Sequence, residues 1–115
     1  MKELIISKEY DYFERQKLIR AICNKWQFVR SFMIGKSCGG RDIKALKIGA
    51  AESYCLIAAG VHGSERITST ILLMFLQELC IAIESGLSLA GINIAKALKG
   101  RGVIFVPCVN PDGCD

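Results

Sequence analysis

A single histidine and a nearby glutamate are the residues of this sequence best suited to metal chemistry. His62 is the only histidine in the chain, and Glu65 follows it by three residues. An imidazole nitrogen and a carboxylate oxygen are both good zinc ligands. Residues three apart share a face in the first turn of a helix, so both side chains can reach one ion. The alternative is a neutral surface histidine, with Glu65 present because acidic residues favour helix N-termini.

The residues around this pair predict a change from strand to helix. Tyr54–Ala59 is a short apolar run typical of a buried strand, and Gly60 breaks it. A helical pattern follows over residues 65–83, with apolar residues around nearly its whole circumference, which is typical of the interior of a larger protein. Gly86 follows the helix, as glycine commonly does. The longest apolar run is far below the ~20 residues of a membrane span, so we expect no membrane partner.

The other elements predict an α/β fold in one domain over residues 1–115. Apolar periodicity predicts a helix over 8–25 and a short helix at Ile92–Lys99. Runs of β-branched or aromatic residues predict strands at Trp26–Ile34 and Arg41–Ile48, which pair antiparallel through the turn Gly35–Gly40. A fourth, buried strand is predicted at Val103–Val109. We therefore expect a mixed β-sheet of about four strands with helices on both faces. Two long helices and one short helix barely cover such a sheet, which indicates that part of the fold is missing.

The glycines and charges of the chain argue against a phosphate-binding loop and against a nucleic-acid-binding arm. Gly35-Lys36-Ser37 does not predict a phosphate loop, because Arg30 occupies the position of the required upstream glycine and no helical pattern follows. The net charge is +4, and no stretch gathers five or six charges of one sign. We therefore expect no nucleic-acid partner.

Six cysteines occur at irregular spacing and without a Cys-x-x-Cys pair. Cys55, Cys80 and Cys108 fall in apolar runs, where cysteine behaves as a small hydrophobe. The first nine residues lack the apolar core and cleavage site of a secretory signal, so we expect a cytoplasmic location with reduced thiols. The alternative is a metal or redox cluster built from these thiols.

Four segments resemble the zinc carboxypeptidase family in their order and spacing: Ile34–Ile43, Ala59–Glu65, Ile67-Thr68 at the start of the long helix, and Val106–Gly113. The sequence is similar to the N-terminal part of a carboxypeptidase A-like catalytic domain. It most resembles bacterial members, including those that cut γ-D-glutamyl–diaminopimelate bonds in cell-wall peptides. The fold that this resemblance implies is a mixed β-sheet with helices on both sides.

The resemblance implies that His62 and Glu65 are the first two zinc ligands, with one Zn²⁺ in each complete catalytic domain. It implies structural roles for the turn Asn110–Gly113 and for Arg41, whereas Arg66 replaces the tryptophan that often follows the zinc glutamate. The family's third ligand is a second histidine, which this chain lacks. The general base, the carboxylate-binding arginines and the substrate tyrosine also have no counterpart here. No catalytic residue is therefore assigned within this chain, and its zinc binding is expected to be weak or absent.

The function implied is zinc-dependent hydrolysis of a peptide bond near a C-terminus, with a peptide as substrate and this chain alone inactive. Two alternatives stay open: an amidohydrolase of the aspartoacylase or succinylglutamate desuccinylase type, and a non-catalytic peptide-binding remnant of the fold. The short length fits either one portion of a larger peptidase or a shortened binding module. We also expect self-association, because the long helix and the fourth strand expose apolar surface that a complete domain covers.

Overall fold

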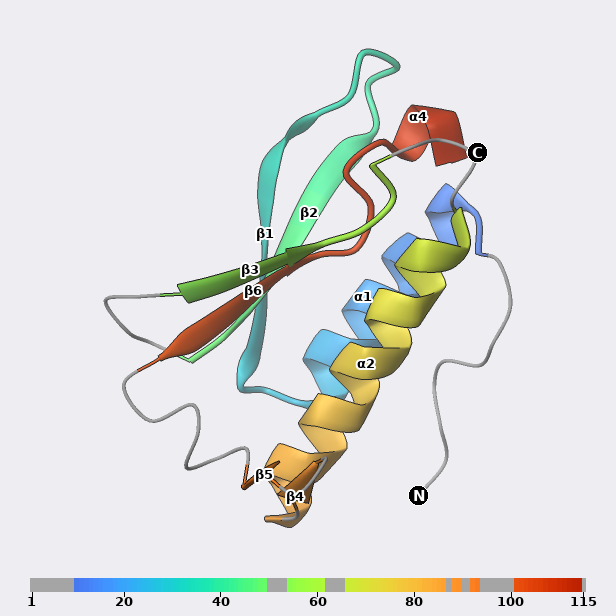
Figure 1. Ribbon diagram of the computed structural model, residues 1–115. Coiled ribbons are helices and arrows are strands. Elements are labelled where there is room, and N and C mark those ends of the chain that lie inside the picture. The colour runs from blue at the N-terminus through green and yellow to red at the C-terminus, as the bar shows by residue number, and fades with distance from the viewer. Residues whose placement is uncertain are drawn as a thin grey trace.

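The computed structural model describes residues 10–49, 54–61, 66–86, 88–89, 92–93 and 101–114. The elements in chain order are α1 (Tyr12–Lys25), β1 (Val29–Lys36), β2 (Asp42–Ile48), β3 (Tyr54–Ala58), α2 (Arg66–Ser85), β4 (Ser88–Leu89), β5 (Ile92–Asn93), β6 (Gly102–Val106) and α4 (Pro111–Cys114). Four strands form a sheet of order β1-β2-β6-β3, and β4 pairs with β5 in a separate two-stranded sheet (Figure 1).

The main sheet is mixed, which confirms the predicted α/β class. β1 pairs antiparallel with β2 as a hairpin, β2 pairs antiparallel with β6, and β3 runs parallel to β6. The predicted fourth strand ends earlier than expected, at Val106, because the following Pro107 has no N–H to continue the ladder. The parallel pair matters for function because the carboxyl ends of two neighbouring strands lie together there.

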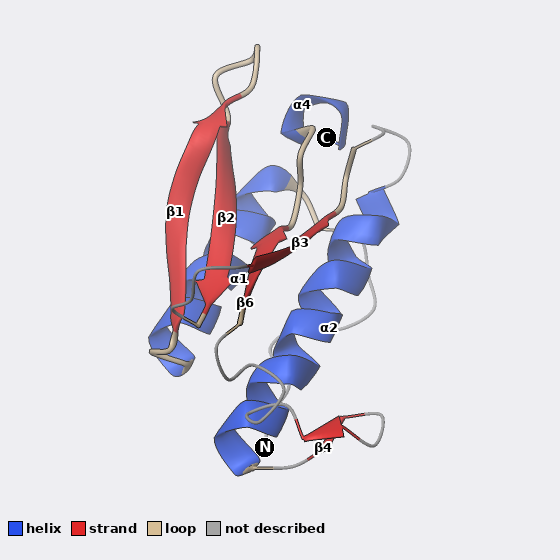
Figure 2. Ribbon diagram, turned by 60° about the vertical axis from the view of Figure 1, so that its left-hand side comes forward, coloured by secondary structure: helices blue, strands red, loops and turns tan. Residues whose placement is uncertain are grey.

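Both long helices lie on the same side of the sheet (Figures 1 and 2). Leu46, Phe105 and Ile57 are opposite one another on neighbouring strands and therefore share one face, and all three belong to or pack against the core that the helices complete. Buried residues of this core include Ile19, Ile22, Trp26, Leu72, Leu73, Leu76 and Leu79. The described residues thus supply one of the two helical layers that the sequence predicts.

The helix α1 begins four residues later than the sequence predicted. Asp11 caps it, because its carboxylate accepts a hydrogen bond from the Glu14 N–H at 2.7 Å while the Glu14 carboxylate accepts one from the Asp11 N–H at 3.2 Å. This reciprocal capping box fixes the first turn at Tyr12. At its other end Trp26, predicted to begin a strand, is the C-cap of α1 and lies in the core.

The strand β3 was expected to be buried, and this prediction is wrong. β3 lies at an edge of the described sheet, and its Leu56 side chain is 65% exposed. Cys55 is exposed as well, whereas Cys80 is buried in the core as predicted. Burial raises the pKa of the Cys80 thiol to about 12, with smaller contributions from neighbouring Cys23 and Glu84. The described residues therefore leave apolar side chains of β3 uncovered.

The short helix predicted at Ile92–Lys99 does not begin as expected. Ile92–Asn93 forms β5, with Leu89 opposite Ile92 and Ser88 opposite Asn93 in β4. Two residues separate the paired positions in the sequence, which is the length of a tight hairpin connection. The remainder of the predicted helix, residues 94–99, lies outside the described residues.

The helix α2 is the longest element and ends at Ser85, two residues beyond the predicted end and immediately before Gly86, the glycine predicted to end it. Its segment Ile67–Ser85 is long and apolar enough to cross a membrane by length and composition, but half of that segment is buried in this fold. We therefore assign α2 to the protein core. Three side chains spaced by four residues form an exposed apolar stripe along it: Ile67 (40% exposed), Ile71 (59%) and Phe75 (42%).

Candidate metal centre

The predicted metal ligands follow a sharp turn at the end of β3. Gly60 has φ of +67°, in the left-handed region that glycine adopts at no steric cost. Its N–H donates to the Thr68 hydroxyl at 3.0 Å, which connects the end of the strand to the beginning of α2. The predicted strand-to-helix junction is therefore present. His62 and Glu65 lie within it but outside the described residues, so their roles as ligands stay predictions.

Close packing also requires glycine at position 60. A Cβ atom there would lie 2.8 Å from the Cys108 sulfur and 2.9 Å from the Ser69 hydroxyl oxygen. These contacts leave no room for a side chain. The Ser69 hydroxyl is itself buried and has no hydrogen-bond partner among the described residues. The junction is thus closely packed by residues that follow β6 and by residues that begin α2.

The carboxyl ends of β3 and β6 remain paired beyond the regular strands. The Ala59 N–H donates to the Val106 carbonyl at 3.0 Å, and the Val109 N–H donates back to the Ala59 carbonyl at 2.9 Å. Next, the Asn110 N–H donates to the Gly60 carbonyl at 2.9 Å. In open α/β sheets, ligands bind at the carboxyl ends of parallel strands. Gly60 lies at such an edge and precedes His62 by two residues in the sequence.

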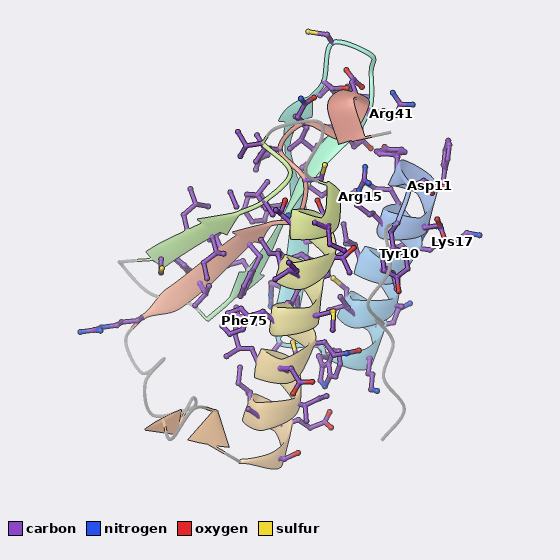
Figure 3. The ribbon with its side chains drawn as sticks, turned by 45° about the vertical axis from the view of Figure 1, so that its right-hand side comes forward. Tyr10, Asp11, Arg15, Lys17, Arg41 and Phe75 are labelled. Carbon is purple, nitrogen blue, oxygen red and sulfur yellow. The ribbon has the colours of Figure 1, made fainter. Side chains whose placement is uncertain are left out.

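A carboxylate joins this edge to the tip of the β1–β2 hairpin. Asp112, in α4, accepts hydrogen bonds from the Ser37 hydroxyl at 2.8 Å, the Gly39 N–H at 2.8 Å and Arg41 Nη1 at 3.1 Å. These donors hold the pKa of the Asp112 carboxyl below its usual value; the largest cause is the Ser37 hydroxyl, followed by the Gly39 N–H. The network confirms the predicted turn-stabilising role of Arg41, which lies beside α4 (Figure 3).

The sequence indicated a turn at residues 35–40 but not its carboxylate partner. The Ser37 hydroxyl also accepts the Arg41 N–H at 3.0 Å, so the turn directs its donors inward. A Cβ on Gly39 would lie 2.7 Å from Asp112 Oδ1, so this glycine lets the carboxylate approach. In the sequence, the two neighbouring glycines between Ser37 and Arg41 could have indicated a turn whose donors bind a carboxylate. The turn Asn110–Gly113 contains the short helix α4 rather than a simple turn.

The chemistry of the donors fits zinc, but the set is incomplete. Structural and catalytic zinc sites use at least three protein ligands, usually imidazole, thiolate or carboxylate. Among the residues that the structure describes, no three such side chains gather in one place. His62 and Glu65 supply two donors of the right kind, and the chain has no second histidine. This chain can therefore provide part of a zinc site through these two residues.

Solved carboxypeptidase structures share the fold. The chain aligns with bovine thrombin-activatable fibrinolysis inhibitor at a TM-score of 0.77 and 21% identity, covering 95% of this chain and 33% of that one. It aligns with carboxypeptidase A from Helicoverpa armigera at a TM-score of 0.73 and 22% identity, covering 98% and 29%. At these identities the likeness defines the fold class, a partial carboxypeptidase-like α/β fold.

The sequence comparison identifies the family. The zinc carboxypeptidase family model matches residues 17–115, and the chain belongs to that family. It is 33% identical over 110 residues to the protein YqgT of Bacillus subtilis, covering 94% of this chain and 29% of that protein. It is 26% identical over 106 residues to gamma-D-glutamyl-L-diamino acid endopeptidase 1 of Lysinibacillus sphaericus, covering 92% and 27%. The chain thus spans less than a third of the curated relatives it matches.

Proposed function

We propose that this chain supplies part of the zinc site of a metallocarboxypeptidase-type peptidase, with His62 and Glu65 as two of the zinc ligands. Membership of the zinc carboxypeptidase family supports the peptidase class. The observation that carries the assignment of residues is the junction at Gly60. There, the chain leaves the carboxyl edge of the parallel pair β3 and β6 immediately before the predicted ligands.

The residues of this chain have holding and orienting roles in the proposed site. The His62 imidazole, in its neutral form, and the ionised Glu65 carboxylate hold the metal. The turn at Gly60, with Cys108 packed beside it, would position the segment that carries these ligands. When bound, zinc lowers the pKa of a bound water and polarises a carbonyl. The proton-transfer and substrate-binding groups belong to other parts of the complete protein, so this chain alone is inactive.

We propose peptides as the substrates, cleaved near a C-terminus, with bacterial cell-wall peptides as the narrower class. The support for that class is one relative, which is named gamma-D-glutamyl-L-diamino acid endopeptidase 1 and is 26% identical over 106 residues. Hydrolysis of γ-D-glutamyl–diaminopimelate peptides, compared with ordinary C-terminal peptides, separates the two classes. A preference for ordinary peptides would limit the proposal to general carboxypeptidase activity.

Two substitutions and a matched control test the ligand assignment in the complete protein. We expect His62→Ala and Glu65→Ala to abolish zinc retention and to lower peptide hydrolysis by at least about 10³-fold, because each removes a donor from the metal. Glu78→Ala is the control, since Glu78 is exposed on α2 and distant in sequence from the junction. Metal content and hydrolysis rate are measured for each variant. Equal zinc content in Glu65→Ala and Glu78→Ala would contradict the assignment.

The same assay separates the alternative functions. Turnover of N-acyl amino acids without turnover of peptides would indicate an amidohydrolase of the aspartoacylase or succinylglutamate desuccinylase type. Saturable peptide binding without turnover, by the zinc-loaded complete protein, would indicate a binding module. Peptide hydrolysis that depends on His62 supports the peptidase proposal over both.

We further propose that the isolated chain self-associates through β3 and α2. A groove of about 310 Å³ runs between these elements, and its lining includes Ile57, Ile71 and Phe75. Beside it, β3 lies at an edge of the described sheet with Leu56 exposed. Two copies related by a two-fold axis can pair such edges antiparallel, because the same surface serves on both. Light scattering that shows a monomer at high concentration would contradict this proposal.

A further inference from the structure

Asp112 connects two segments of the chain that are far apart in sequence. Its carboxylate uses both oxygens: Oδ1 accepts from Ser37 and Arg41, and Oδ2 accepts from the Gly39 N–H. The hydrogen bond to Ser37 spans 75 residues. Since three donors from different directions converge on one short side chain, the carboxylate is held in a single orientation.

The turn that receives Asp112 is itself closed by hydrogen bonds. The Ser37 N–H donates to the Arg41 carbonyl at 2.8 Å, and the Gly40 N–H donates to the Ser37 carbonyl at 3.0 Å. The hairpin below it is secured by an ion pair of 3.3 Å between Lys36 and Asp42. The hairpin turn is thus held by its own hydrogen bonds, and its position determines where the Asp112 carboxylate lies.

From Asp112 the restraint passes through the backbone to the metal-ligand segment. Asn110 precedes Asp112 by two residues, and its N–H donates to the Gly60 carbonyl at 2.9 Å. Gly60 precedes His62 by two residues, and a Cβ added at Gly60 would lie 2.8 Å from the Cys108 sulfur. A displacement of Asp112 therefore changes where the chain leaves the sheet toward His62.

We propose that Asp112 is a positioning residue for the metal centre. Through the hairpin turn, it fixes the segment 109–112 and with it the Gly60 junction that orients His62. The inference rests on the proposed zinc site and adds a remote carboxylate that sets its geometry. Residues that orient metal ligands from outside the coordination shell contribute strongly to affinity.

The test uses the 115-residue chain without zinc and nuclear magnetic resonance of His62. As the chain contains one histidine, a single imidazole signal reports on that residue without ambiguity. Asp112→Asn weakens the clamp, and Gly39→Ala places a Cβ 2.7 Å from the carboxylate oxygen. Gly35→Ala is the matched control, because a Cβ there meets nothing within 4 Å. Glu78→Gln is the second control, a carboxylate-to-amide change at an exposed position of α2.

We expect Asp112→Asn and Gly39→Ala to shift the His62 signal of the zinc-free chain. The two controls should leave that signal unchanged. If Asp112→Asn loses its folded circular-dichroism spectrum, Ser37→Ala decides, because it removes one donor and keeps the carboxylate. We expect a smaller shift of the same His62 signal in that variant.

Unchanged His62 signals in Asp112→Asn, Gly39→Ala and Ser37→Ala would overturn the positioning role even if zinc binds normally. Zinc content of the complete protein that is unchanged in His62→Ala would instead count against the proposed zinc ligand. In that case, the comparison of zinc-free signals still decides whether Asp112 orients His62. The two failures are therefore distinguishable.

Discussion

The tip of the β1–β2 hairpin and the β3 edge of the sheet differ in the partners of their side chains. At the hairpin tip, polar groups have polar partners: the turn after β1 binds Asp112, and Lys36 pairs with Asp42. At the β3 edge, Leu56 is exposed, and Ile71 of α2 is exposed as well. The strand β1 also exposes Phe32, Met33 and Ile34, so the contrast holds for the hairpin tip and not for the whole edge strand. Adjoining apolar side chains are stabilised when another surface covers them, which supports the proposed association through β3 and α2; we call this surface the interface edge.

In the sequence, the predicted metal ligands follow β3 at the interface edge, and we propose that contacts of the hairpin tip position them. Segment 106–110 runs beside residues 59–60 and then reaches the hairpin turn through Asp112. The proposed zinc site would therefore lie next to the surface proposed for association, at which further ligands can be supplied.

The largest expected effect contrasts a buried and an exposed residue in adjacent strands. Phe105 of β6 is fully buried, whereas Leu56 of β3 is 65% exposed. We expect Phe105→Ala to lower the free energy of unfolding by about 3–5 kcal/mol, because it leaves a cavity in the core. Leu56→Ala should change it by no more than about 0.5 kcal/mol. Urea denaturation measures both, and comparable losses would show that β3 is covered in the isolated chain.

The interface edge predicts the next effect, on self-association. Ile71→Asp places a charge in the apolar stripe of α2 and should weaken association of the isolated chain by at least about tenfold. Phe13→Asp is the control, because Phe13 is 70% exposed on α1, away from the groove. Sedimentation velocity over a concentration series reports both. An equal loss in the two variants would mean that association does not use the β3–α2 surface.

The junction at Gly60 predicts a difference in stability between alanine substitutions at two glycines. Gly60 and Gly86 have nearly equal φ angles, +67° and +66°, but a Cβ on Gly86 meets nothing within 4 Å. Gly86→Ala should cost about 1–2 kcal/mol of stability for the left-handed conformation alone. Gly60→Ala should cost about 1–3 kcal/mol more, because its Cβ overlaps Cys108 and Ser69. Thermal denaturation compares them, and equal costs would contradict the close packing of the junction.

The smallest expected effect is the pH dependence of stability that arises from Asp112 at the hairpin tip. Since the folded-state pKa of Asp112 lies below its ordinary value of 3.8, the folded state favours the ionised carboxylate. The stabilisation is therefore fully present above about pH 5 and is lost as the pH falls through the folded-state pKa. We expect Asp112→Asn to melt a few degrees below wild type at neutral pH, with the gap narrowing as the pH falls below 3.8. A gap independent of pH would mean that ionisation of Asp112 does not matter.

Local sequence signals predicted the elements with short-range causes. The hairpin of β1 and β2, the break at Gly60 and the end of α2 at Gly86 each depend on residues within a few positions. The capping box of Asp11 and Glu14 was equally local, but the helix pattern continued through it in the sequence and concealed the boundary. The pairing of β4 with β5 was missed because two-residue strands carry too little periodicity to register.

Long-range contacts account for what the sequence could not predict. The bond between Ser37 and Asp112 spans 75 residues, and neither residue alone specifies the other. The apolar composition of β3 predicted burial, yet exposure depends on which elements lie next to the strand. For the metal centre, the types and spacing of His62 and Glu65 predict ligands, and the structure adds the junction that carries them. A third ligand depends on residues outside this pair.

The most direct test of the central claim is X-ray absorption spectroscopy of the zinc-loaded protein. Zinc–nitrogen and zinc–oxygen distances are about 2.0–2.2 Å, and zinc–sulfur distances are about 2.3 Å, so the spectrum identifies the donor atoms. The account predicts nitrogen and oxygen donors only, with imidazole scattering that disappears in His62→Ala. A sulfur shell would contradict it and would direct attention to the thiols, first to Cys108, which packs against Gly60.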